Sequence, residues 1–340
     1  SSEGGLRLAA ALWVFWWVRG HTGEGRAWLA ALLAPNGSAP PTQRARALRA
    51  AGALAYYQAD LLAAEQQLRR ALALFQEVGD LHGISRALRN LSVVLGEQSK
   101  FAEARAYAEE SLALARTLGD KQNLANVLSD LGVLDYFLGD CARALPYLEE
   151  SLALNRSLDD QHDIAIRLHN LAEVLGAMGD YARALQLYAE SLALFRAAEN
   201  DYGVAFTLQA QGNIYCAQGA VPQAQALMHD ALALFRKLGD RQGMGLALLG
   251  LAGATIELGQ LECAARLLGA LDHLLAEKSV TFKPPDVDRC RRMTAAVRAQ
   301  LPPEQFAPAW EAGRQLSLED ALDRASAAVA AEHGVSNQCN

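Results

Sequence analysis

The tetrapeptide Ser151-Leu152-Ala153-Leu154 is one of five copies in the chain, of which three begin with serine and two with alanine. The copies begin at residues 71, 111, 151, 191 and 231, so each starts 40 residues after the last. Leucine recurs at the same interval from Leu8 to Leu248, and alanine recurs from Ala64 to Ala264. Because three separate positions keep one period without an insertion, the sequence predicts an internally repeated architecture.

Each repeat is expected to be a pair of helices. In the fifth repeat, apolar residues from Ile164 to Leu175 recur at helical spacing and predict a helix over 164–177. Gly179 then suits the left-handed cap that ends many helices, and a second helix is expected over 181–196. Small residues recur from Gly52 to Ala252, where the paired helices would cross. An N-cap is expected at five equivalent positions, namely Asp80, Asp120, Asp160, Asn200 and Asp240.

The repeat resembles the tetratricopeptide repeat. In the fifth unit the residues that match are Leu168, Leu171, Ala172, Leu175, Gly179-Asp180-Tyr181, Ala184, Tyr188 and Ser191. Each unit here has about two helical turns more than that family's usual repeat. The resemblance implies an all-α fold, a right-handed α-α superhelix of the tetratricopeptide type, with seven helical hairpins over residues 5–284. The first and last units depart most from the pattern, as capping units do.

The period stops at Pro284-Pro285. The sequence predicts a C-terminal helical appendage over residues 285–331, with helices over 286–301 and 304–314. A last short helix is capped by Ser317 and ends near residue 331. Residues 332–340 are expected to be a disordered tail.

Composition narrows the class of protein further. The chain has 340 residues, 51% of them hydrophobic, and a net charge of −7, which argues against a nucleic-acid-binding face. The apolar stretch 6–18 is shorter than the ~20 residues that span a bilayer, so no membrane segment is expected. Five dispersed cysteines favour a reducing, cytoplasmic compartment. Because the chain begins at Ser1 without methionine, it is expected to be part of a longer protein.

A second, narrower resemblance concerns the two ends of the chain. The opening residues 6–13, 18–21 and 24–29 look like the start of the tetratricopeptide sensor domain of bacterial NB-ARC-like (STAND) ATPase regulators of the LuxR or AfsR type. The closing stretches 264–270, 306–310 and 313–321 look like the end of that domain. This resemblance implies an upstream ATPase domain as an intramolecular partner.

No motif for catalysis or for a cofactor was found in the sequence. The P-loop and the HExxH motif are both absent, and the glycine-rich stretch 239–253 follows a helix rather than a strand. His162 and His169 lack the spacing of a zinc site. We therefore expect no cofactor and no enzyme activity, with a catalytic site in the C-terminal appendage as a remote alternative.

The family resemblance implies that the first helix of each hairpin lines a concave face, with inward positions at 169, 173 and 176–177 of the fifth unit. An Asn beside them contacts the ligand backbone in related peptide-binding members. Aromatic and amide groups on such a face suit capture of an extended peptide. The candidate groove residues are Trp13, Trp16, Trp17, Arg49, Tyr56, Tyr57, Arg89, Asn90, Asp130, Tyr136, Phe137, His169, Asn170, Glu173, Gln209 and Asn213.

Two functions remain open from the sequence. The favoured one is a module that binds a protein segment, a peptide or a small effector for a larger bacterial signal-transduction or transcriptional regulator. The alternative is a passive assembly scaffold that self-associates or joins proteins through its end or convex surfaces. The tryptophans of the first unit also have an alternative role, in which they pack on an upstream domain or fill the superhelix.

Overall fold

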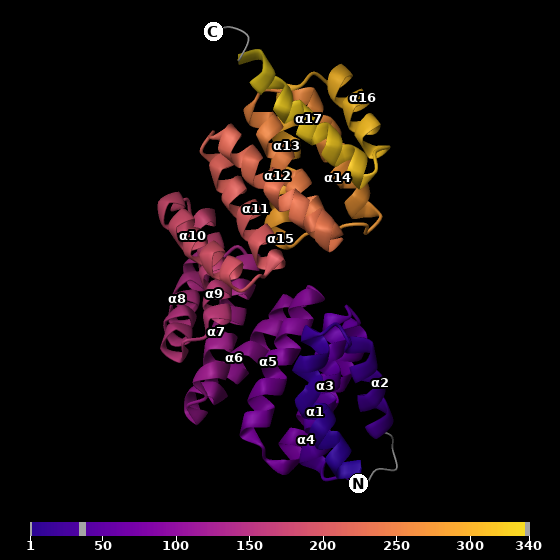
Figure 1. Ribbon diagram of the computed structural model, residues 1–340, viewed down its shortest axis with the longest axis vertical. Coiled ribbons are helices and arrows are strands. Elements are labelled where there is room, and N and C mark those ends of the chain that lie inside the picture. The colour runs from indigo at the N-terminus through magenta and orange to yellow at the C-terminus, as the bar shows by residue number, and fades with distance from the viewer. Residues whose placement is uncertain (1, 34–38, 337–340) are drawn as a thin grey trace. The chain divides into compact units, whose positions relative to one another are not determined.

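The computed structural model describes residues 2–33 and 39–336, and these ranges contain seventeen helices and no strand (Figure 1). Seven helical hairpins come first, which confirms the all-α repeat architecture. The hairpins are α1 (Ser2–Val18) with α2 (Thr22–Leu32), α3 (Pro41–Tyr57) with α4 (Leu61–Val78), α5 (Leu81–Glu97) with α6 (Phe101–Leu118), α7 (Lys121–Phe137) with α8 (Cys141–Leu158), α9 (Gln161–Ala177) with α10 (Tyr181–Ala197), α11 (Asp201–Ala217) with α12 (Val221–Leu238), and α13 (Arg241–Glu257) with α14 (Leu261–Ala276).

The helix ends follow the chemistry that the sequence predicts. Gly179 has a φ of 85°, a left-handed conformation that glycine adopts without a steric penalty. The side chain of Asp160 accepts a hydrogen bond from the backbone N–H of Asp163 and so caps α9. The four other expected caps do the same for their helices, namely Asp80 for α5, Asp120 for α7, Asn200 for α11 and Asp240 for α13.

Two recurring contacts hold the hairpins together. The small residue of the first helix lies where the second helix crosses it, and a Cβ added at Gly132 would lie 2.6 Å from Leu148 Cγ. In addition, Ser151 of α8 donates its hydroxyl hydrogen to the carbonyl oxygen of Ala125 in α7, at 2.7 Å. The equivalent serines make equivalent contacts, Ser111 to the carbonyl of Ser85 and Ser191 to the carbonyl of Ala165.

The chain divides into two compact units. Unit 1 comprises residues 1–138 and 142–158, and unit 2 comprises residues 139–141 and 159–340. In unit 1 the cores of successive hairpins are apolar, with Leu54, Leu88 and Leu128 at most 1% exposed. In unit 2 one core cluster extends from α9 through the hairpins into the C-terminal helices.

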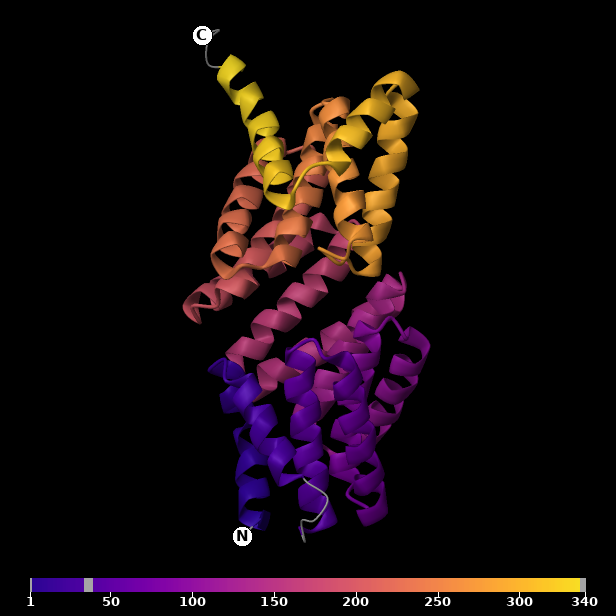
Figure 2. The same cartoon turned by 90° about the vertical axis from the view of Figure 1, so that its right-hand side faces the viewer.

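Three further helices complete unit 2, namely α15 (Pro284–Gln300), α16 (Pro303–Arg314) and α17 (Leu318–Ser336). Helices α16 and α17 pack on the last hairpin, and Figure 2 shows them in yellow at the C-terminal end of unit 2. Gly269 of α14 and Gly313 of α16 each face backbone of the other helix, so these helices cross too closely for a side chain at either position.

The C-terminal end differs from the prediction in one respect. Helix α17 continues to Ser336, beyond the expected end near residue 331. Ser317 caps its start, and its apolar residues Leu318, Leu322 and Ala325 are buried. The expected disordered tail begins at residue 332, within this helix, and residues 337–340 lie outside the described part of the chain. No described helix is long and apolar enough to span a membrane.

Candidate functional site

An aromatic cluster lies on the first helices of unit 1. The rings of Trp17 and Tyr57 stack with centroids 4.4 Å apart and an interplanar angle of 19°. Tyr56 meets Tyr57 edge to face at 5.2 Å. Trp17 is 39% exposed and Tyr57 is 42% exposed, so this stacked pair presents apolar rings to solvent. Exposed large rings grouped in this way are typical of binding surfaces.

An ion pair adjoins the aromatic cluster. Arg89 Nε of α5 lies 2.7 Å from Asp130 Oδ2 of α7, so two predicted groove residues bind each other. Burial raises the pKa of Tyr57, Arg89 acts to lower it, and Asp130 acts to raise it further. The Tyr57 ring therefore lies within electrostatic range of the pair. Unit 1 thus brings aromatic rings, a guanidinium and a carboxylate together, a combination suited to a polypeptide segment.

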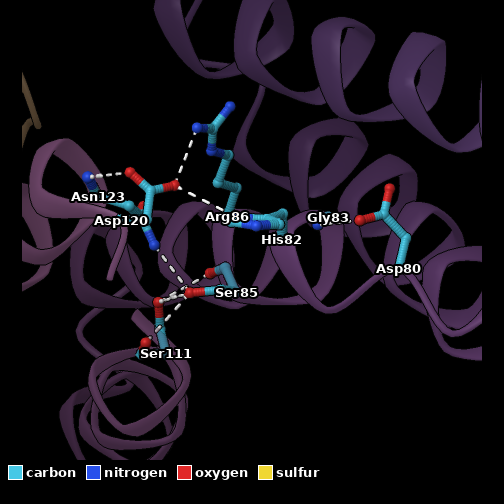
Figure 3. A network of polar contacts seen from close by, with 8 residues as sticks. All are labelled: Asp80, His82, Gly83, Ser85, Arg86, Ser111, Asp120 and Asn123. Atoms are coloured by element: carbon cyan, nitrogen blue, oxygen red, sulfur yellow. Dashed lines mark hydrogen bonds and ion pairs between the residues drawn. The ribbon is translucent and has the colours of Figure 1, made fainter. Parts of the chain in front are cut away.

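A cavity of about 790 Å³ lies between α1, α3 and α5 of unit 1. Its charged walls are mainly basic, with Arg46 and Arg49 on α3 and Arg86 on α5. Figure 3 shows Arg86 and His82 of α5 reaching the same carboxylate, Asp120. Burial acts to raise the pKa of Asp120, but hydrogen bonds from the backbone of Asn123 and from Arg86 outweigh it, so that pKa lies below its usual value.

One predicted groove residue of the first hairpin, Trp16, lies in the core. Trp16 is 7% exposed and fills the core between α1 and α2, where a Cβ on Gly25 would lie 2.6 Å from its ring. Trp16 is therefore a core residue and not a surface residue. Its position in the helix explains the difference, because consecutive residues point about 100° apart and Trp17 takes the exposed direction. Trp13 is half-buried and packs against the same core.

Three other predicted residues of unit 1 lie on the first helices of the third and fourth hairpins. Asn90 of α5 is half-buried beside Arg89 in the chain. Tyr136 and Phe137 end α7, with ring centroids 5.9 Å apart, and both are half-buried. They form a second aromatic pair at the position that Tyr56 and Tyr57 occupy on α3, two repeats earlier.

In unit 2 one of the five predicted groove residues is buried and the other four are half-buried. Gln209 of α11 is 5% exposed, so it is a buried residue rather than a groove residue. His169 Nδ1 lies 3.2 Å from Thr207 Oγ1, and the His169 ring packs edge to face on Tyr188. Burial lowers the pKa of His169 to about 4, so the imidazole is neutral at physiological pH.

The C-terminal segment that precedes and includes α15 lies against the inner side of unit 2. A Cβ on Gly245 would lie 3.0 Å from Val280, and one on Gly253 would lie 3.6 Å from Met293 Cε. Burial, and then Asp286 of α15, raise the pKa of Glu173 to about 8, although 37% of its side chain is accessible to water. Of the remaining predictions on this face, Asn170 and Asn213 are half-buried, and the Asn213 Oδ1 atom is buried without a hydrogen-bond partner.

The sequence did not predict that this segment lies on the concave face. Helix α15 carries five charged residues in its first half-length and buries only Cys290 and Val297, so its sequence has no strong apolar face that would indicate a docking position. The basic cavity of unit 1 was also missed in part. Arg46 and Arg86 lie at equivalent positions three residues before Arg49 and Arg89, and this pairing was the available signal.

Metal and thiol chemistry find no support in the described residues. Within them, no group of three or more His, Cys, Asp or Glu side chains is arranged to hold a metal ion. The four cysteines with described placement are free thiols. Burial raises the pKa of Cys216 to about 11, which leaves this thiol protonated and unreactive at neutral pH.

Comparison with known families agrees with the helical hairpins. A model described as the tetratricopeptide repeat matches residues 43–117, 83–157 and 123–197, and successive matches start 40 residues apart. Residues 43–197 are tetratricopeptide repeats, and the hairpins on either side of them keep the same period. No curated protein sequence matches the chain significantly.

Several solved structures share this fold at low sequence identity. A Rap protein complexed with competence and sporulation factor has a TM-score of 0.59 at 14% identity, covering 96% of this chain and 100% of that one. NprR in complex with its cognate peptide NprX has a TM-score of 0.56 at 17% identity, covering 69% of this chain and 68% of that one.

A third similar structure is a larger protein. It is a signal transduction ATPase with numerous domains (STAND) from Pyrococcus horikoshii, which carries a tetratricopeptide repeat sensor. Its TM-score is 0.57 at 14% identity, covering 85% of this chain and 41% of that one. At such identities these likenesses establish the fold.

Proposed function

We propose that the chain is a non-catalytic module that binds a protein or peptide segment, and that its binding surface is the concave face of unit 1. The exposed, stacked pair of Trp17 and Tyr57 is the observation that carries this proposal. Each ring offers a large apolar area with few rotatable bonds, so little conformational entropy is lost on binding. The Arg89–Asp130 pair beside it provides groups of both charges for an extended backbone and its side chains.

The choice of unit 1 rests on a difference between the two units. In unit 2 the corresponding inner positions are occupied by Gln209, which is buried, and by His169, which is bonded to Thr207. The chain's own C-terminal segment also lies against that face. A peptide would have to displace this segment from unit 2, whereas the aromatic rings of unit 1 are already exposed.

We further propose that the module is the effector-sensing or autoregulatory part of a larger bacterial signal-transduction or transcriptional regulator, acting in the cytoplasm beside an ATPase domain. Two similar structures contain bound partners, a cognate peptide in one and competence and sporulation factor in the other. A third belongs to a signal transduction ATPase in which the repeats are described as the sensor. A switch of this kind requires that the ligand bind two states of the regulator with different affinity.

Selection from a random dodecapeptide phage library on the immobilised chain tests the binding site. Enriched peptides should bind the wild-type chain in fluorescence anisotropy, and Trp17→Ala should weaken binding about tenfold or more, a typical cost for a central aromatic anchor. Trp28→Ala is the matched control, because Trp28 is 55% exposed on α2 of the same unit and lies outside the cluster. Equal loss in both variants, or no enrichment, would contradict the proposed site.

An assembly scaffold remains the second candidate, and one observation favours it. Leu8 and Phe15 are spaced by seven residues on α1 and are 61% and 51% exposed, so they form an apolar stripe on the first hairpin. A scaffold that self-associates through this stripe should sediment as a discrete oligomer, and Leu8→Glu with Phe15→Glu should convert it to a monomer. A monomer at high concentration would argue against this candidate.

A further inference from the structure

We infer that the basic cavity between α1, α3 and α5 of unit 1 is a binding site for a small molecule that carries a phosphoryl group, and a diphosphate fits its charge best. This inference goes beyond the proposed peptide-binding function and does not depend on it. It rests on the cavity walls, on guanidinium groups without carboxylate partners, and on the orientation of three helices.

The cavity has the size of a small-molecule site. Its volume of about 790 Å³ lies within the ~300–1,000 Å³ range of ligand pockets. Four arginines from three helices line it, namely Arg7 of α1, Arg46 and Arg49 of α3, and Arg86 of α5. His82 lines it as well, and Asp80 is the one acidic residue among the lining residues.

The positive charge of the cavity is only partly neutralised. Arg86 bonds to Asp120, and Arg89 next to the cavity bonds to Asp130. Asp80 already accepts the backbone N–H of Gly83 as the cap of α5 (Figure 3). In the described part of the chain, no carboxylate forms an ion pair with Arg46 or Arg49. These two guanidiniums therefore offer unused donors to a ligand.

Arg49 shows the effect of the surrounding charge. Burial, followed by the repulsion of Arg86, Arg89 and Arg46, lowers its pKa to about 10. A guanidinium so close to three others is stabilised by any anion that enters between them, and an anion with two or more negative charges gains most. In the free protein the arginines therefore repel one another, and a bound anion would reduce this repulsion.

The backbone of the cavity adds to this preference for anions. Gly4, Gln43 and His82 lie in the first turns of α1, α3 and α5, so three helices present their N-terminal ends to one cavity. Those ends carry partial positive charge, which favours an anion. On α3 no side chain caps the helix, although the backbone N–H of Gln43 donates to the carbonyl oxygen of Pro40.

The repeats themselves provide an internal comparison. Residues at the positions of Arg46 and Arg49 become Arg86 and Arg89 on α5, Asn126 and Ser129 on α7, and Ile166 and His169 on α9. Paired arginines thus occur in two adjacent repeats and are lost in the next two. Fold maintenance does not need them, because hairpins of the same design form without them.

The ligand class follows from the chemistry of the guanidinium group. Arginine binds phosphate and carboxylate oxygens through two parallel hydrogen bonds, and these charge-assisted bonds are about twice as strong as neutral ones. A diphosphate concentrates several negative charges within the span of one cavity, whereas a peptide carboxylate brings one charge per side chain. Four arginines around one cavity therefore favour the phosphoryl anion.

Titration calorimetry and thermal unfolding with inorganic pyrophosphate test the inference on the full chain. Pyrophosphate should bind and raise the melting temperature in a concentration-dependent way. Arg49→Gln and Arg46→Gln should each weaken binding about tenfold or more, the equivalent of one charge-assisted hydrogen bond. Arg70→Gln is the matched control, because Arg70 is exposed on α4 of the same unit and does not line the cavity.

A second readout does not require the ligand. Arg49→Gln should raise the melting temperature of the ligand-free protein, because it removes the repulsion among the arginines, and Arg70→Gln should not. Trp17→Ala should leave pyrophosphate binding unchanged, so failure of the peptide site and failure of the phosphoryl site can be told apart.

Three outcomes would overturn the inference. They are the absence of pyrophosphate binding, equal binding in the Arg46 and Arg49 variants, and tighter binding of hexaglutamate or citrate than of pyrophosphate at matched ionic strength. A nucleoside diphosphate tested in parallel distinguishes the two sources of the phosphoryl group. Tighter binding than pyrophosphate would assign the rest of the cavity to the nucleoside, and equal binding would assign the site to the free anion.

Discussion

Glu173 and His169 of unit 2 are both uncharged near neutral pH, although they lie 3.9 Å apart. Burial lowers the pKa of His169 to about 4, and burial together with Asp286 raises the pKa of Glu173 to about 8. The carboxyl group ionises near its ordinary pKa of 4.5 in the unfolded chain. The contribution of Glu173 to the free energy of unfolding is therefore fully present below pH 4.5. It is lost as the pH rises from 4.5 through 8.

This titration predicts that Glu173→Gln reduces the loss of stability at alkaline pH. Between pH 7 and pH 9 the melting temperature of the wild type should fall more than that of the variant. His169 does not interfere in this window, because its contribution is lost only below pH 6.5, as the pH falls toward 4. Glu311→Gln, at an exposed position on α16, should behave as the wild type. Parallel curves for wild type and Glu173→Gln would contradict the assigned pKa.

At the scale of the helix, the crossing of α7 and α8 depends on the absence of a side chain at Gly132. Alanine there would place its Cβ 2.6 Å from Leu148 Cγ and 3.3 Å from the carbonyl oxygen of Ala144. We expect Gly132→Ala to lower the free energy of unfolding by about 1–3 kcal/mol, the usual cost of overpacking. Chemical denaturation followed by circular dichroism measures this change.

The control for this prediction is another helical glycine with more space around it. At Gly176 a Cβ would lie 3.4 Å from Ile214 Cδ1, an ordinary contact distance. Gly176→Ala should therefore be neutral or should stabilise the protein by about 0.5–1 kcal/mol through helix propensity. Destabilisation of equal size in both variants would show that the helix crossing is not the cause.

The N-terminus of α7 depends on Asp120 for more than capping. Its side chain accepts the backbone N–H of Asn123 and also binds Arg86 of α5, so it links two hairpins. Asp120→Ala should cost more than the ~1 kcal/mol expected for loss of a cap alone. Asp160→Ala removes the equivalent cap of α9 and should show the cap cost by itself. Urea denaturation compares the two, and equal losses would assign no stability to the link with α5.

At the scale of the whole chain, the helices after the last hairpin cover an apolar surface. Leu267, Leu268 and Leu271 of α14 are completely buried, and α16 crosses α14 at Gly269. Truncation after Ala276 would expose this surface to water. We expect the truncated chain to bind the dye ANS and to aggregate, whereas truncation after Ser336 should leave folding unchanged. Size-exclusion chromatography and dye fluorescence distinguish these outcomes.

Most of the fold could be predicted from the 40-residue period of the sequence. This period predicted all seven hairpins and the caps at Asp80, Asp120, Asp160, Asn200 and Asp240, because short-range patterns determine helix ends. The site was harder to predict. Trp16 and Trp17 are neighbours in sequence but differ in burial because of helical geometry, and no sequence pattern places α15 on the inner side of unit 2. Such placement depends on tertiary packing between distant segments.

The constant length of the repeat also bears on how such a chain changes through evolution. Identical stretches such as the Ser-Leu-Ala-Leu tetrapeptides at residues 111, 151 and 191 are sites where misaligned gene copies can recombine. Because the repeat length is 40 residues, and three successive units share the same hydroxyl-to-carbonyl contact, gain or loss of one of these units keeps the reading frame and places similar helices side by side at the new junction. Stability in such arrays depends mainly on adjacent units. Gain or loss of whole repeats can therefore change the length of this protein, and the position of a binding patch, without requiring a new type of hydrophobic core.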